Sequence, residues 1–225
     1  MNKEWSDLNK LMQSQLKKRE TIQEGFQTLF LLRENLWEQM LHFREELSNE
    51  QFSLMPFMNA SGYHSKSIAY SLWHVFRIED IVAHSLIAGN EQIFFKNNYQ
   101  DRIHSPIITT GNELEKEEIR IFSEQLNIPE LYHYIEEVYQ STNQIISEMT
   151  FEQLKTSIPK DCKERLWKSK VVSEMDRASW LVDYWCDKDV RGLVQMPFSR
   201  HWIMHVEACM RIEDKIIRRK HGKNI

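Results

Sequence analysis

The sequence predicts an all-α protein, a bundle of four long helices with additional short ones. Its 225 residues include only six glycines and five prolines, and most of these lie between apolar segments instead of inside them. The apolar residues recur at spacings of three and four, which is the period of a helix. Because no Gly/Ser/Pro-rich linker divides the chain, we expect a single domain over residues 1–225.

The composition limits the classes of partner. With 41% apolar and 28% charged residues, the chain has the balance of a globular protein. The net charge is -4 and the basic residues are dispersed, so we expect neither nucleic acid nor a membrane as a partner. No apolar stretch approaches the ~20 residues that span a bilayer. Three widely spaced cysteines without a C-x-x-C pair favour reduced thiols, which predicts a cytoplasmic protein.

The N-terminal half contains three predicted helices. Residues 1–20 form an accessory amphipathic helix that packs on the body or mediates dimer contact. Its apolar residues are Trp5, Leu8, Met12 and Leu16. A long helix over about 21–47 carries one wide apolar stripe and ends before SNEQFSLMPF. A second long helix over about 66–88 begins at Ser65 or Ser67 and is apolar nearly all round, so we expect it to be central.

The C-terminal half begins with a long connection. Residues 90–112 show no steady period, and connections of this length are usually functional or mobile, so a lid is one interpretation. A short helix over about 113–126 precedes the third long helix, about 129–149, which starts at an Asn-Ile-Pro sequence. Residues 161–188 form one helix or two, and the last long helix runs over about 199–219.

Two histidines lie one turn apart in the last helix, in the stretch RHWIMHVEACMRIED. At ~100° per residue, His201 and His205 are about 40° apart on a face that they share with apolar residues. His74 in the second long helix likewise shares a face with Ile78 and Val82. Because a buried polar group without a partner costs ~1 to 3 kcal/mol, three inward imidazoles need partners.

Two interpretations of these histidines remain open. In the first, the three imidazoles bind a divalent metal and leave a fourth position for water or substrate, as in catalytic zinc sites. In the second, each histidine is a core residue bonded to a carbonyl, a tyrosine or a carboxylate. Cys209 extends the pattern to H-x-x-x-H-x-x-x-C, but it lies ~12 Å along the helix from His201, so we interpret it as a buried apolar residue.

Other catalytic patterns are missing from the sequence. It has no H-E-x-x-H, no G-x-S-x-G and no Gly-rich phosphate loop. The single E-x-x-H at 130–133 is too little for a carboxylate di-iron bundle. Asp80 and His84 are predicted to make a local contact on another face of their helix. The tetrapeptide R-I-E-D occurs at 77–80 and 211–214, which we interpret as solvated or salt-bridged helix faces.

Two stretches resemble a known family. SKSIAYSLWHVFRIEDIVAHSLIAG resembles the second-helix motif of the DinB-like superfamily, in which a Ser-Ile-Ala start leads to a Trp-His pair and an Arg-x-Glu segment. MPFSRHWIMHVEACMRIED resembles the last helix of that family with its H-x-x-x-H. LSNEQFSLMPF is similar to the link after the first helix of the family, and the resemblance spans about residues 21–219.

The resemblance implies an up-and-down four-helix bundle of DinB-like type, commonly a homodimer, that holds a divalent metal through three histidines. The matching positions are His74, His201 and His205. Zinc is the favoured metal, with nickel and iron as alternatives. The aromatic-rich segment 161–198 exceeds the simple pattern, and we interpret its additional helices as a cap on one end of the bundle.

The superfamily includes thiol-dependent S-transferases and members without known activity. The resemblance therefore implies a metal-dependent transferase or hydrolase, whose cation lowers the pKa of a bound thiol or water and whose substrate is a small thiol or another small molecule. Tyr70, one turn before His74, is the candidate to orient or relay a proton. Glu79 is less favoured because it lies ~140° around the helix from His74. The alternative is a non-catalytic scaffold or stress-response protein with a structural metal or none.

Overall fold

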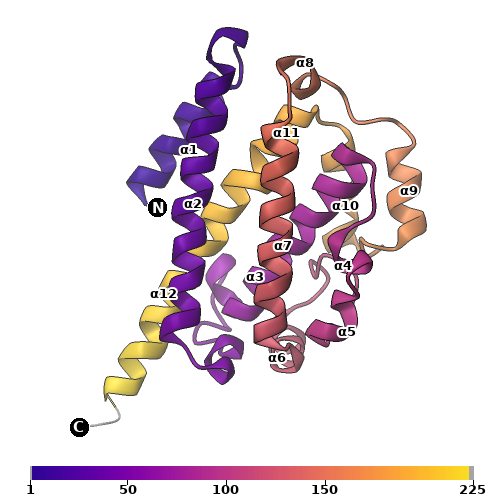
Figure 1. Ribbon diagram of the computed structural model, residues 1–225. Coiled ribbons are helices and arrows are strands. Elements are labelled where there is room, and N and C mark those ends of the chain that lie inside the picture. Colours follow the sequence, from indigo (N-terminus) through magenta and orange to yellow (C-terminus); the bar gives the residue numbers. More distant parts are fainter. Residues whose placement is uncertain (1, 223–225) are drawn as a thin grey trace.

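Four helices form the frame of the structure (Figure 1). The computed structural model describes residues 2–222 and the side chains of residues 2–218. α2 (Ile22–Glu46) and α3 (Ile68–Asp80) each contact both α7 (Ile128–Ser147) and α12 (His201–Gly222). Within the described residues, extended segments pair only at one isolated bridge between positions 157 and 189, so the all-α prediction is confirmed.

α3 is buried along its whole length, as predicted for a central helix. It begins after Ser67, whose hydroxyl accepts the Tyr70 N–H at 2.9 Å. From Ile81–Ala88 the same helix widens into π-helical turns, and Gly89 ends it with a φ of 66°. A left-handed residue at the end of a helix is best supplied by glycine, which has no Cβ to clash.

The N-terminal helix packs on its own chain. α1 (Lys3–Gln15) lies along α2, and Met12 and Leu16 are fully buried between them (Figure 1). Gly25 of α2 allows this approach, because a Cβ there would lie 2.7 Å from Cδ2 of Leu16. The accessory helix therefore takes the first of the two roles that the sequence allowed, packing on the body.

The connection over residues 90–112 is more ordered than the sequence predicts. It contains α4 (Ile93–Lys96) and α5 (Tyr99–Ile103), each too short to show a helical period. The Asp80 carboxylate accepts the backbone N–H groups of Ile93 and Phe94, both at 2.9 Å. A buried carboxylate at the end of α3 thus ties the first half of the connection to the body of the protein.

Shorter helices precede and follow α7 in the chain (Figure 1). They are α6 (Lys116–Gln125), α8 (Phe151–Leu154), α9 (Cys162–Ser169), α10 (Asp176–Cys186) and α11 (Val190–Val194). The segment 161–188 therefore resolves into two helices. Apolar residues of α8 to α11 pack with α1, the start of α2 and the π-helical turns after α3 in a core cluster of their own. A separate cluster joins the four long helices to α6 and the 90–112 connection.

A buried ion pair links the long helices. The Arg33 guanidinium of α2 donates two hydrogen bonds to the Glu79 carboxylate of α3, at 2.8 and 3.1 Å. It also donates to the Phe198 carbonyl at 2.9 Å and to the Asn143 side chain of α7 at 2.7 Å. Trp202 of α12 donates to Glu79 at 2.7 Å and lies under the guanidinium. Both charged side chains are fully buried, so these contacts fix the four helices relative to one another.

The two R-I-E-D tetrapeptides have different environments. Arg77, Glu79 and Asp80 are fully buried, so the solvated interpretation is wrong for the first copy. Its salt-bridged interpretation is confirmed, because the Arg77 guanidinium lies 3.5 Å from the Asp80 carboxylate. Arg211 and Asp214 of the second copy are exposed. The matching letters therefore do not mark a structural repeat.

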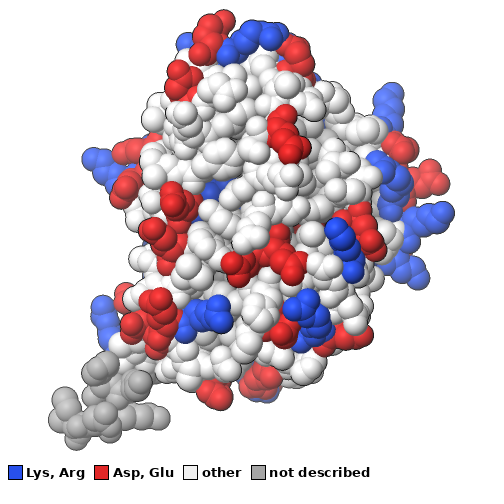
Figure 2. Space-filling model, viewed as in Figure 1, with Lys and Arg blue, Asp and Glu red and all other residues white. Residues whose placement is uncertain are grey.

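The surface carries acidic and basic side chains interspersed on the face shown in Figure 2. Within residues 2–222, no helix combines the length and the apolarity that a membrane crossing requires.

We expect Arg33→Met to lower the free energy of unfolding by about 3 to 5 kcal/mol, because it leaves the Glu79 carboxylate buried without its cation. Lys163→Met is the control, since that exposed ammonium pairs with Asp183 at 2.9 Å. It should change the free energy by less than about 1 kcal/mol. Urea unfolding followed by circular dichroism measures both. Equal losses in the two variants would contradict a special role for the buried pair.

Candidate metal centre

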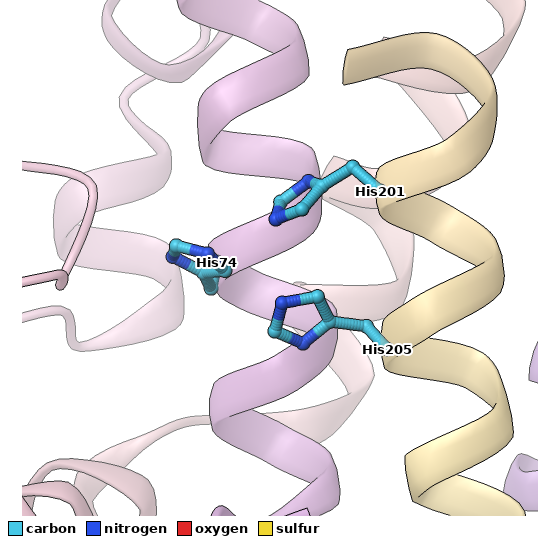
Figure 3. Close-up of side chains that lie close together, drawn as sticks. All are labelled: His74, His201 and His205. Carbon is cyan, nitrogen blue, oxygen red and sulfur yellow. The ribbon is translucent and has the colours of Figure 1, made fainter. Parts of the chain in front are cut away.

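Three histidines converge between α3 and α12. Figure 3 shows the rings of His201 and His205 extending from α12 toward the ring of His74 on α3. One ligand nitrogen from each lies within 4.8 Å of the other two. All three side chains are buried, with at most 7% of any residue exposed. The structure therefore brings together the three positions that the sequence singled out.

Three of the six imidazole nitrogens are buried and have no hydrogen-bond partner in the described part of the chain. Nδ1 of His74 donates to the Thr110 carbonyl at 2.6 Å, which leaves the Nε2 lone pair available. Nδ1 of His201 and both nitrogens of His205 are buried, and none has a hydrogen-bond partner among the described residues. The interpretation of these residues as hydrogen-bonded core histidines requires such partners. Their absence around His205 favours the ligand interpretation instead.

Burial keeps the three imidazoles neutral. It lowers the pKa of His74 to about 4, although donation to the Thr110 carbonyl acts in the opposite direction. The pKa values of His201 and His205 lie well below the ordinary value, first because of burial and then because neighbouring imidazoles repel a second charge. The neutral imidazole is the form that binds a metal ion. The cluster therefore presents ligands rather than cations at neutral pH.

The spacing of the nitrogens fits one ion. Zinc holds imidazole nitrogens at about 2.1 Å in a tetrahedron, which separates them by about 3.4 Å. The nitrogens here lie within 4.8 Å of one another, so small ring rotations bring them to that separation. Three imidazoles suit zinc, nickel or iron. The three buried histidines could thus hold a divalent metal ion.

A loop at the end of the 90–112 connection orients His74. The Thr110 carbonyl accepts from this histidine, and the next carbonyl, that of Gly111, accepts from the Tyr70 hydroxyl at 2.8 Å. Gly111 has a φ of 77°, and a Cβ there would lie 2.9 Å from the Trp73 ring. The segment that the sequence marked only as a connection therefore supplies the backbone that holds a site histidine.

Tyr70 is placed to support this arrangement. Its ring stacks on the ring of His74 at a centroid distance of 5.4 Å. Burial raises the pKa of its hydroxyl above the ordinary value, and the hydroxyl donates a hydrogen bond to the Gly111 carbonyl. These contacts are those of a positioning group, and proton relay by Tyr70 stays a prediction. Glu79 is engaged by Arg33 and Trp202 and is fully buried.

The start of α12 depends on the buried ion pair. The chain enters α12 through a π-helical turn, Met196–Arg200, and the Phe198 carbonyl in this turn accepts from Arg33. Trp202, the neighbour of His201, donates to Glu79. Sequence reasoning missed Arg33 and Thr110 because partners that lie 46 and 36 residues apart leave no periodic signal.

A cavity of about 230 Å³ opens beside His74 and His201. Its walls include Trp180 and Trp185 of α10. The sequence predicted that this segment only caps one end of the bundle, whereas these two residues also line the cavity. His205 does not line the cavity, and its ring centroid lies 4.7 Å from that of His201. An ion held by the three histidines would have its open position next to this cavity.

Two secondary predictions are confirmed. His84 contacts the Asp80 carboxylate at 2.8 Å, away from the histidine cluster. Cys209 is a free, buried cysteine within the main core, and burial raises the pKa of its thiol to about 12.

Comparison with models of protein families finds no match to this chain, and no curated protein matches it either. The resemblance of the two helices stays an expectation, so we infer function from the geometry of the histidines and the cavity.

We expect Gly111→Ala to weaken metal binding and lower stability more than Gly89→Ala. Both glycines have positive φ, so each substitution carries about 1 kcal/mol of backbone strain. Only at Gly111 does the added Cβ meet neighbours, whereas none lies within 4 Å at Gly89. Metal titration and thermal unfolding of both variants measure the difference. Identical behaviour of the two variants would contradict the positioning role of the loop.

We expect the cysteines to alkylate slowly at pH 8. Burial raises the pKa of the half-buried Cys186 to about 11, so only roughly one molecule in a thousand carries the thiolate. Its reaction with iodoacetamide should accelerate about tenfold per pH unit up to that pKa. Cys209 should react only on unfolding. Mass spectrometry measures both rates, with Cys186→Ser as the control. Fast modification of Cys209 at pH 8 would make it a candidate nucleophile.

Proposed function

We propose that this protein is a metal-dependent enzyme of DinB-like type, a thiol S-transferase or a hydrolase, with His74, His201 and His205 as its metal ligands. One observation carries the proposal. Both nitrogens of His205 are buried without a partner among the described residues, while two further imidazoles lie within reach of the same point. An ion at that point would supply one nitrogen of each imidazole with a partner.

The number of ligands supports catalysis over a structural role. Structural zinc sites in proteins have four protein ligands, whereas catalytic sites have three and an open position. The group of candidate ligands in the described residues consists of three side chains. Two of them line a cavity, so the fourth position is accessible to a small molecule.

The residues around the ligands divide the remaining tasks. When bound, a divalent cation lowers the pKa of a thiol or water ligand and so supplies a nucleophile near neutral pH. Thr110 holds the tautomer and orientation of His74, which raises the basicity of that ligand. Tyr70 holds the same loop through Gly111. The mainly apolar wall of the cavity lowers the polarity around the reacting groups.

The arrangement of α2, α3, α7 and α12 supports an up-and-down four-helix bundle of the kind that the resemblance implies. The same resemblance implies a homodimer, and the widely spaced cysteines favour a cytoplasmic location; both are parts of this proposal. A non-catalytic scaffold is the competing function, and an inaccessible metal with no response to thiols would favour it.

The test is elemental analysis of the protein purified without a metal-affinity tag. We expect about one equivalent of metal in the wild type and none in the triple variant His74→Ala, His201→Ala, His205→Ala. The double variant His42→Ala, His133→Ala removes two exposed histidines and should retain the metal.

Circular dichroism of each protein checks that it is folded. This control separates a loss of metal binding from a loss of structure. Equal metal content in the wild type and the triple variant would overturn the proposal. A cobalt-substituted protein whose visible spectrum does not change on addition of any thiol or of a water-competing anion would retain the metal and exclude the catalytic role.

A further inference from the structure

The cavity beside the histidines has an uncharged lining. Apart from His74 and His201, the side chains that form its wall are aromatic or aliphatic, with Asn112 as the one amide. Among the described residues, no lysine, arginine, aspartate or glutamate lines it. A charged ligand moved from water into such a lining loses hydration without gaining a counter-charge, which costs several kcal/mol.

Aromatic side chains stand at the mouth of the cavity. Trp180 and Tyr63 are 50% and 44% exposed, and they belong to the few large apolar residues that the described structure leaves exposed. Trp180 meets Tyr184 edge to face, with ring centroids 5.7 Å apart. The indole N–H of Trp180 already donates to the Arg177 carbonyl at 3.0 Å. The ring of Trp180 therefore offers apolar carbon surface rather than a hydrogen bond to a ligand.

The inner wall is fully buried and apolar. Ile78 of α3, Leu181 and Trp185 of α10 are each at most 4% exposed and line the same cavity. An apolar cavity of about 150 Å³ is enough to bind benzene. The present volume of about 230 Å³ is therefore large enough for one substituted aromatic ring.

We propose that the cavity recognises a substrate with a single uncharged aromatic ring, seated between Trp180 and Trp185, whose reactive group reaches the histidines. The assignment of a substrate class rests on the proposed function. Binding of the aromatic ring in the cavity does not require a metal. Trp180 and Tyr184 are the specificity-determining residues, because they form the aromatic wall at the mouth.

The geometry favours a neutral ring over an ionic one of the same size. An aromatic wall also attracts cations, through the negative faces of its rings. That attraction is smaller than the cost of moving an ammonium group from water into a lining without carboxylates, whether or not a metal is bound. An anion would meet only neutral donors in the wall, which are the Asn112 amide, the tyrosine hydroxyls, the indole N–H of Trp185 and the imidazoles.

The test begins with the protein stripped of metal by a chelator. Benzyl alcohol, phenylacetate and benzyltrimethylammonium share one ring and differ in charge, and NMR titration measures the affinity of each. We expect benzyl alcohol to bind at least tenfold more tightly than either ion. Trp180→Ala should weaken its binding about tenfold, and Trp180→Phe should restore most of the loss. Trp167→Ala, on the neighbouring helix α9 and outside the cavity wall, is the matched control and should leave the affinity unchanged.

A second arm uses the cobalt-loaded protein and two thiols, benzyl mercaptan and 2-mercaptoethanol, followed by visible absorption. Benzyl mercaptan should saturate at a concentration at least tenfold lower, and Trp180→Ala should abolish the difference. Ions that bind the metal-free protein as tightly as benzyl alcohol, or a Trp180→Ala variant with unchanged affinity, would overturn the inference. A protein that does not bind cobalt but still prefers benzyl alcohol would contradict the proposed function. It would support the recognition of the aromatic ring.

Discussion

The architecture depends on one guanidinium that is withdrawn from water. Arg33 is fully buried, and a buried cation is tolerated only when an anion and further acceptors surround it. Glu79, Asn143 and the Phe198 carbonyl supply these acceptors from three other parts of the chain. Because the N–H donors of a guanidinium form a rigid planar fork, the atoms that accept from it must lie in fixed directions around it. The positions of α2, α3, α7 and the start of α12 follow from that arrangement.

The histidine cluster shows the opposite treatment of buried polar groups. The ion pair is saturated with hydrogen bonds, whereas both nitrogens of His205 have no partner in the described structure. A protein of marginal stability keeps such groups at a cost, and functional sites are where that cost is usually found. The two clusters are neighbours, since Trp202 contacts the ion pair and His201 precedes it in the chain. A rigid, saturated cluster thus positions an unsaturated one.

The protein's own thiols are poorly suited to the chemistry proposed for the site. Cys209 lies one turn after His205, but it is buried within the main core and its pKa is raised to about 12. In the proposed function, the nucleophile would therefore come from a small molecule that enters the cavity beside His74 and His201. The apolar wall and the neutral imidazoles lower the polarity there, which would strengthen the electrostatic effect of a bound cation. In our proposal, the aromatic side chains of Trp180 and Tyr184 select the molecules that enter the cavity.

The helical class, the approximate extent of the four long helices and the three histidine positions could all be predicted from the sequence. These are local properties, because the period of apolar residues and the i, i+4 spacing place side chains on one face of a helix before any tertiary contact forms. The helices α4 and α5 escaped prediction because a single turn has no period. Only the packing of the helices shows that Arg33 donates to Glu79, that the Thr110 carbonyl accepts from His74 and that Trp180 lines the same cavity as His201. Such contacts join residues far apart in the chain, and their geometry is set by how whole helices pack, which no local pattern records.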